Sequence, residues 1–81
     1  MEKANYIELL HYIAKHLVTE PDAIQIEQLE NGDSVTLQLR VAPADIGRVI
    51  GRQGRIAKEI RAIVKSCGMR DNKRVTVDIL D

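Results

Sequence analysis

The strongest constraint on the fold is a strict alternation of apolar and polar side chains over residues 34–41, which predicts a strand with one buried face. The apolar positions are Val35, Leu37, Leu39 and Val41. Residues 23–30 alternate less regularly, because Leu29 is out of phase and marks either a bulge or the end of a strand. Asn31-Gly32 stands between the two segments, and both residues tolerate positive φ. The two segments therefore predict an antiparallel hairpin.

The residues before this hairpin predict an amphipathic helix from Asn5 to about Thr19. Asn5 and Glu8 have the spacing of a capping box, in which the Asn5 side chain accepts a hydrogen bond from the first helical turn. Pro21 disfavours helical conformation in the residue before it and so ends the segment. Apolar side chains recur at helical spacing at Tyr6, Leu10, Ile13, Ala14 and Leu17.

Two further helices and a last strand are predicted after the hairpin. Pro43 suits the first turn of a helix, and Asp45 complements the dipole of that helix. The second helix is expected to end at Gly68. Its apolar side is formed by Ile56, Ile60, Ile63, Val64 and Cys67. Alternation over residues 74–80 predicts the final strand.

The resulting element order is α-β-β-α-α-β, which belongs to the α/β (α+β) class. A connection through two helices joins parallel strands of one sheet, whereas the hairpin strands are antiparallel. We therefore expect a two-layer sandwich, with a mixed three-stranded sheet covered on one face by three helices. With 81 residues the chain is long enough for one core, so residues 1–81 are predicted to form a single domain.

Composition narrows the functional classes. The chain has no Trp or Phe, so an RNA-binding sheet that stacks bases on exposed aromatic rings is not expected. The single cysteine, Cys67, cannot form an internal disulfide, which fits the cytoplasm. No catalytic set is recognisable, and His11 and His16 lie on different faces of their helix, so neither an enzyme nor a metal site nor a cofactor is predicted.

The zero net charge hides a strong asymmetry along the chain. Residues 1–41 carry three basic and seven acidic residues, whereas residues 42–81 carry nine basic and five acidic ones. Between positions 48 and 65 the chain has six basic residues and a single acidic one, Glu59, and this excess of positive charge favours an anionic partner. These basic residues are Arg48, Arg52, Arg55, Lys58, Arg61 and Lys65.

The segment Gly51-Arg52-Gln53-Gly54 separates the two later helices. Glycines at both ends permit positive φ and let a second backbone approach closely, while the following helix offers free N–H groups to a phosphate. The spacing of Gly47, Gly51 and Gly54 fits neither the dinucleotide fingerprint nor the P-loop. The alternative without function is a corner between two helices, but the arginines beside the glycines favour a site for a sugar-phosphate backbone.

The run Val49-Ile50-Gly51-Arg52-Gln53-Gly54-Arg55-Ile56-Ala57-Lys58-Glu59-Ile60 resembles the signature of the KH domain, although Ile56 stands one position early. The element order is similar to the type II, prokaryotic form. The length of the chain and its Arg40-Val41-Ala42-Pro43 segment resemble the stand-alone bacterial KH proteins of the KhpA family. The resemblance implies a groove for about four nucleotides of single-stranded RNA, clamped by the glycine loop.

The resemblance also implies site residues and partners. The residues expected to bind RNA are Arg40, Ile46, Arg48, Val49, Ile50, Gly51, Arg52, Gln53, Gly54, Arg55 and Lys58. Thr36 and Gln38 join Arg40 as candidates for the strand wall of the groove. Related proteins pair with themselves and with a larger, multidomain KH-containing RNA-binding protein. The expected role is an RNA chaperone or post-transcriptional regulator. The alternatives are a dimerisation adaptor with a KH fold and a protein that binds single-stranded DNA.

Overall fold

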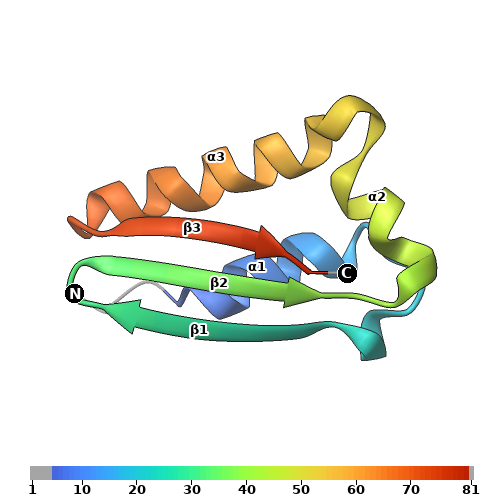
Figure 1. The fold of residues 1–81 in the computed structure, drawn as a ribbon, viewed down its shortest axis with the longest axis horizontal. Helices are drawn as coiled ribbons and strands as arrows, with labels where there is room; N and C mark the ends of the chain where they lie inside the picture. Colours follow the sequence, from blue (N-terminus) through green and yellow to red (C-terminus); the bar gives the residue numbers. More distant parts are fainter. Residues whose placement is uncertain (1–4, 81) are drawn as a thin grey trace.

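The structure is a computed structural model that describes residues 5–80; the first four residues and Asp81, which the predicted domain includes, lie outside this part (Figure 1). Its elements follow the predicted order, with three short 3₁₀ turns between them. They are α1 (Tyr6–Lys15), η1 (Pro21–Ala23), β1 (Gln25–Asn31), β2 (Ser34–Arg40), η2 (Pro43–Asp45), α2 (Ile46–Ile50), η3 (Arg52–Gly54), α3 (Arg55–Arg70) and β3 (Arg74–Ile79).

The sheet is mixed, as predicted, with the order β1-β2-β3. β1 and β2 are antiparallel over the whole of β1, from Gln25 opposite Arg40 to Asn31 opposite Ser34. β2 and β3 are parallel, because α2 and α3 carry the chain back to the start of the sheet before β3 begins (Figure 1). β3 is consequently an edge strand, and it lies beside α3.

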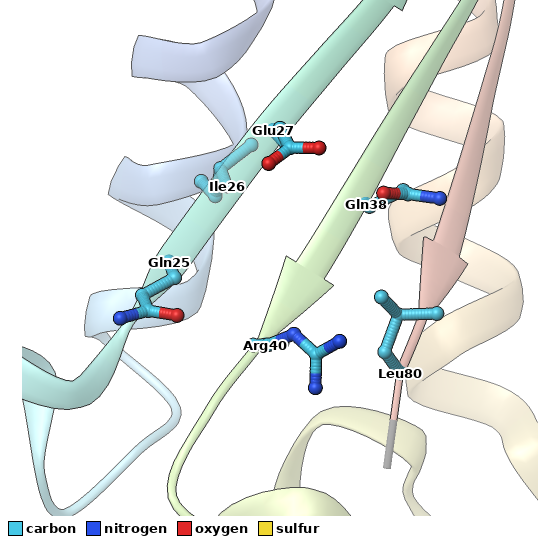
Figure 2. A pocket seen from close by; sticks show the side chains of 6 residues that line it. All are labelled: Gln25, Ile26, Glu27, Gln38, Arg40 and Leu80. Atoms are coloured by element: carbon cyan, nitrogen blue, oxygen red, sulfur yellow. The ribbon is translucent and has the colours of Figure 1, made fainter.

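One hydrophobic core lies between the sheet and the helices. β2 crosses its centre with three fully buried side chains, and α2 contributes Val49 to the same core. α1 and α3 lie behind the sheet when it is viewed from its open face (Figure 2). The innermost core residues are Leu10, Ala14, Val35, Leu37, Leu39, Val49, Ile60, Val64, Val75 and Val77. The predicted two-layer arrangement is thus confirmed.

The first helix begins as predicted and ends earlier. Asn5 caps it by accepting a hydrogen bond from the Glu8 N–H at 3.1 Å, but the helix stops at Lys15 instead of near Thr19. The reason lies in Asp45, which is fully buried and accepts hydrogen bonds from the N–H and hydroxyl of Thr19, at 3.0 and 2.9 Å, and from the N–H of Glu20 at 3.1 Å. A continued helix would not present these donors to Asp45. The sequence had placed Asp45 only at a helix dipole.

The hydroxyl of Tyr6 makes a second long-range link, in which it donates a hydrogen bond to the Asp71 carboxylate. This contact joins the beginning of α1 to the end of α3. Burial of the ring, together with the hydrogen bond to the Asp71 carboxylate, raises the pKa of Tyr6 to about 12. The sequence had identified Tyr6 only as an apolar position of its helix.

Four local predictions are corrected by the structure. The hairpin turn is formed by Gly32 and Asp33, with positive φ at Gly32 only, and β1 runs through Leu29 to Asn31 without a bulge. Leu29 is half-exposed on the open face of the sheet. α3 continues through Gly68 to Arg70. A Cβ at Gly68 would lie only 2.4 Å from Cγ2 of Val75, so glycine is what allows the helix to pass this strand residue. Ile63 is 48% exposed and so does not belong to the buried side of α3.

Candidate nucleic-acid interface

The Gly51–Gly54 loop has a backbone conformation that ordinary residues rarely adopt. Gly51 has φ 77° and ψ 175°, a combination almost restricted to glycine, and Gln53 and Gly54 also have positive φ. The Gly54 N–H bonds to the Gly51 carbonyl at 3.2 Å and closes the turn. Within residues 5–80 no hydrogen bond engages the N–H groups of Arg52 and Gln53. Two adjacent free donors in such a turn form a concave site for an anion.

The loop is held in place by Ile56. A Cβ at Gly51 would lie 2.6 Å from Cγ1 of Ile56, so this side chain folds directly over the Gly51 α-carbon. The position of Ile56, one residue earlier than the family signature, therefore serves to close the loop. At Gly54 a Cβ would meet no atom within 4 Å, so the loop is open at this position.

Basic residues stand in the loop and on the two helices that flank it. Arg52 belongs to the loop, and Arg55 and Lys58 stand on the first turn of α3; all three are exposed. Arg48 on α2 is also exposed, with Nε 3.5 Å from Oδ1 of Asp45. Burial alone would raise the pKa of Asp45, but its hydrogen bonds from Thr19 and Glu20 and the charge of Arg48 lower it overall. Asp45 thus stays ionised and neutralises part of the Arg48 charge.

The apolar residues of α2 divide into two groups. Ile46 and Ile50 are half-buried, so each keeps some surface beside the loop. Val49 has 0% exposure and packs in the core, so its side chain is not available to a base. This burial contradicts the expectation that Val49 contacts a base. Val49 instead anchors α2, and with it the loop, to the sheet.

A groove of about 470 Å³ runs between α3 and β3. It is lined from the helix by Arg61 and Lys65 and from the strand by residues Val75–Asp78. Nε of Arg61 donates a hydrogen bond to the Val77 carbonyl at 3.1 Å and so bridges the two walls. The sequence identifies Arg61 and Lys65 only as members of the basic segment between positions 48 and 65. Their role depends on β3 lying beside α3, which residue spacing along α3 does not reveal.

The residues expected to form the strand wall of the RNA groove do not lie in the α3–β3 groove. Thr36, Gln38 and Arg40 are on the face of the sheet away from the helices, and none of them lines the α3–β3 groove. Gln38 and Arg40 line a separate hollow of about 270 Å³, shown in Figure 2. Its other lining residues are Gln25, Ile26, Glu27 and Leu80. Side-chain alternation identifies the exposed face of a strand, but it does not reveal which strand forms the sheet edge beside α3.

Other site types find no support in residues 5–80. This part of the chain contains no group of three or more His, Cys, Asp or Glu residues placed to hold a metal ion. Its helices include none that is both long enough and apolar enough to cross a membrane.

Comparison with known proteins gives a consistent result. The protein-family model of the KhpA/KhpB KH domain matches residues 7–79 of the chain. A protein of Clostridium acetobutylicum named RNA-binding protein KhpA is 49% identical over 73 residues, which cover 90% of this chain and 97% of that protein. A protein of Borreliella burgdorferi with the same name is 42% identical over 80 residues, or 99% of this chain and 98% of that one.

A solved structure supports the fold. The chain superposes with a TM-score of 0.65 on part of an Aquifex aeolicus Era variant bound to GDP and AlF4⁻, at 20% sequence identity. The match covers 91% of this chain and 29% of the Era chain. At this level of identity the likeness extends to the arrangement of helices and strands only.

Proposed function

Because the chain belongs to the family of KhpA/KhpB KH domains, we propose that it binds single-stranded RNA by clamping the sugar-phosphate backbone with the Gly51–Gly54 loop. The chain would act as a single KH domain and a non-enzymatic RNA chaperone or post-transcriptional regulator in the cytoplasm. The bases would then lie along the groove between α3 and β3, because α3 forms one wall of this groove and also carries Arg55 and Lys58 on its first turn.

The observation that carries this proposal is the pair of free N–H groups at Arg52 and Gln53 within a positively charged loop. Donors fixed in a turn bind a phosphate without further loss of backbone entropy, and Arg52, Arg55 and Lys58 add attraction at longer range. Ile50 provides a half-buried apolar surface beside the phosphate site, against which a sugar or base can pack.

A groove for about four nucleotides should bind weakly by itself. We therefore propose that a second copy of this chain, or a larger multidomain KH-containing protein, supplies another groove on the same RNA. Linking two sites raises the apparent affinity by about 10²- to 10⁴-fold without new contacts in either groove.

The test is binding of short RNA oligomers to the parent and to the double variant Arg52→Asp with Gln53→Asp, measured over a range of salt concentrations. Both side chains are exposed, so the variant should keep the fold, but two new carboxylates would repel the phosphate. We expect RNA binding to be lost in the variant. In the parent the logarithm of affinity should fall with the logarithm of salt, by about 0.7 per phosphate contact.

A matched control places the same charge change on the other side of the molecule, with Gln25→Asp and Arg40→Asp on the open face of the sheet. This control should bind RNA more tightly than the loop variant. Equal binding by parent and folded loop variant would exclude the clamp. DNA oligomers of the same sequence distinguish an RNA-specific groove from one that accepts either nucleic acid. A parent that binds neither would support the adaptor alternative.

A further inference from the structure

The outer edge of β3 presents backbone hydrogen-bonding groups to the groove. The Arg74 N–H bonds to the Asp33 carbonyl at 2.8 Å, and the Leu80 N–H bonds to the Leu39 carbonyl at 2.9 Å. Even-numbered residues of β3 thus point their backbone groups toward β2. Because these directions alternate along a strand, the N–H and C=O groups of the odd-numbered residues, including Val77, point toward the open edge.

Arg61 changes what this edge offers at Val77. Its Nε donates to the Val77 carbonyl at 3.1 Å, so one of the two lone pairs of this acceptor is already occupied. The two Nη atoms of Arg61 carry four more N–H donors, and the Val77 N–H remains without a partner within residues 5–80. Lys65, one turn further along α3, lines the same groove and is also only a donor. At Val77 the groove therefore presents more hydrogen-bond donors than acceptors.

From this arrangement, and resting on the proposed RNA binding, we propose that Arg61 selects a base with two adjacent hydrogen-bond acceptors at the Val77 position of the groove. Guanine offers such a pair at O6 and N7, and cytosine offers one at O2 and N3. Adenine places an amino group beside each of its acceptors on these edges, and uracil has an N–H between its two carbonyls. Adenine and uracil are therefore disfavoured at this position.

Asp78, the acidic residue that lines the groove, does not reverse the preference for guanine or cytosine. Asp78 lies opposite Gln38 in the β2–β3 register, so its side chain is on the open face of the sheet and not on the side of the core. Within residues 5–80 it forms no ion pair with Arg61 or Lys65. Thr76 is on the same face and bonds to Thr36 at 3.3 Å. Both residues line the groove, but within residues 5–80 neither side chain bonds to Arg61.

The test uses seven-nucleotide RNAs of uridine with one guanosine, cytidine or adenosine placed at each position in turn. The parent is compared with Arg61→Met, which removes one charge and frees the Val77 carbonyl. Lys65→Met is the matched control, because it removes one charge from the same groove and leaves Arg61 in place. A further RNA carries 7-deazaguanosine, which lacks the N7 acceptor. Thermal melting of each variant establishes that the fold is retained.

For the parent we expect one position at which guanosine or cytidine binds about tenfold more tightly than adenosine, the value of one good bidentate contact. Arg61→Met should reduce this ratio to about twofold or less, whereas Lys65→Met should weaken all RNAs and keep the ratio. 7-Deazaguanosine should weaken binding to the parent but not to Arg61→Met. RNA binding without such discrimination, or with discrimination unchanged in Arg61→Met, would overturn this inference alone. If no RNA binds the parent at all, the proposed function falls together with it.

Discussion

Gly51 and Gly54, the two glycines of the loop, should respond very differently to the same substitution. In Gly51→Ala the backbone angles of 77° and 175° fall in a region that costs a side-chain-bearing residue about 1–3 kcal/mol. The new methyl group would also lie 2.6, 2.9 and 3.0 Å from three atoms of Ile56, and forced overpacking of this kind costs about 1–3 kcal/mol more. We expect Gly51→Ala to lower the free energy of unfolding by about 4 kcal/mol, the middle of the combined range.

Gly54→Ala is the matched control. Gly54 has φ 75° and ψ 13°, which is the left-handed helical region, and a Cβ there meets nothing within 4 Å. The backbone cost of about 1–2 kcal/mol is partly offset, because alanine restricts the unfolded chain more than glycine does. We expect a net loss of about 1 kcal/mol or less for Gly54→Ala.

The assay is denaturation by guanidinium chloride, followed by far-ultraviolet circular dichroism because the chain has no Trp. If the free energy of unfolding falls by about 2 kcal/mol per molar denaturant, Gly51→Ala should lower the midpoint of unfolding by about 2 M and Gly54→Ala by less than about 0.5 M. A domain of this size has a total stability of about 4–12 kcal/mol, so the lower part of this range would leave Gly51→Ala partly unfolded in water.

A double-mutant cycle separates the collision from the backbone strain. Ile56→Ala removes the atoms that the new methyl group would meet, so Gly51→Ala should cost about 1–3 kcal/mol less in the Ile56→Ala background than in the parent. Strictly additive losses would show that Ile56 does not close the loop. Equal losses at Gly51 and Gly54 would refute the whole explanation of why the first glycine is required.

Further predictions concern sites away from the loop. Asp45→Asn should destabilise the fold at neutral pH. The folded-state pKa of Asp45 is lowered, so its contribution to stability is present above about pH 4 and is lost as the pH falls below that value. The acid limb of a curve of stability against pH should therefore flatten in this variant. Tyr6→Phe should lose about 1 kcal/mol at pH 7, and the parent, unlike this variant, should lose stability as the pH rises from about 10 toward the folded-state pKa of about 12. Gly68→Ala should cost about 1–3 kcal/mol, because its Cβ meets the Val75 side chain, whereas Gly47→Ala on α2, where a Cβ meets nothing within 4 Å, should gain about 0.5–1 kcal/mol. Melting temperatures that rank Gly68→Ala above Gly47→Ala would contradict this assignment.

Much of the architecture could be predicted because the necessary signals are local. The alternation at Val35, Leu37 and Leu39 identified a half-buried strand, since only one register places all three in the core. The Asn5 cap and the hairpin were predictable because they depend on residues a few positions apart. The glycine loop could be located for the same reason, since positive φ at Gly51 and Gly54 is a property of single residues.

Features that depend on contacts distant in sequence could not be predicted in this way. The burial of Asp45 requires Thr19 and Glu20, which lie 26 and 25 residues earlier, beyond the end of α1 at Lys15. Gly68 reads as a helix terminator, yet it is needed inside α3 because β3 passes against it.

The sequence by itself determined the parts of the proposed clamp: two helices, a loop between them with glycine at both ends, and a concentration of positive charge. Only the tertiary structure decided which residues line the groove along which we propose that the nucleic acid continues. The position of β3 at the sheet edge brings Arg61 to the Val77 carbonyl, and it leaves Arg40 on the opposite face. The physical reason is that periodicity specifies which face of each element is buried, whereas the neighbours of that element are specified by packing across the whole chain.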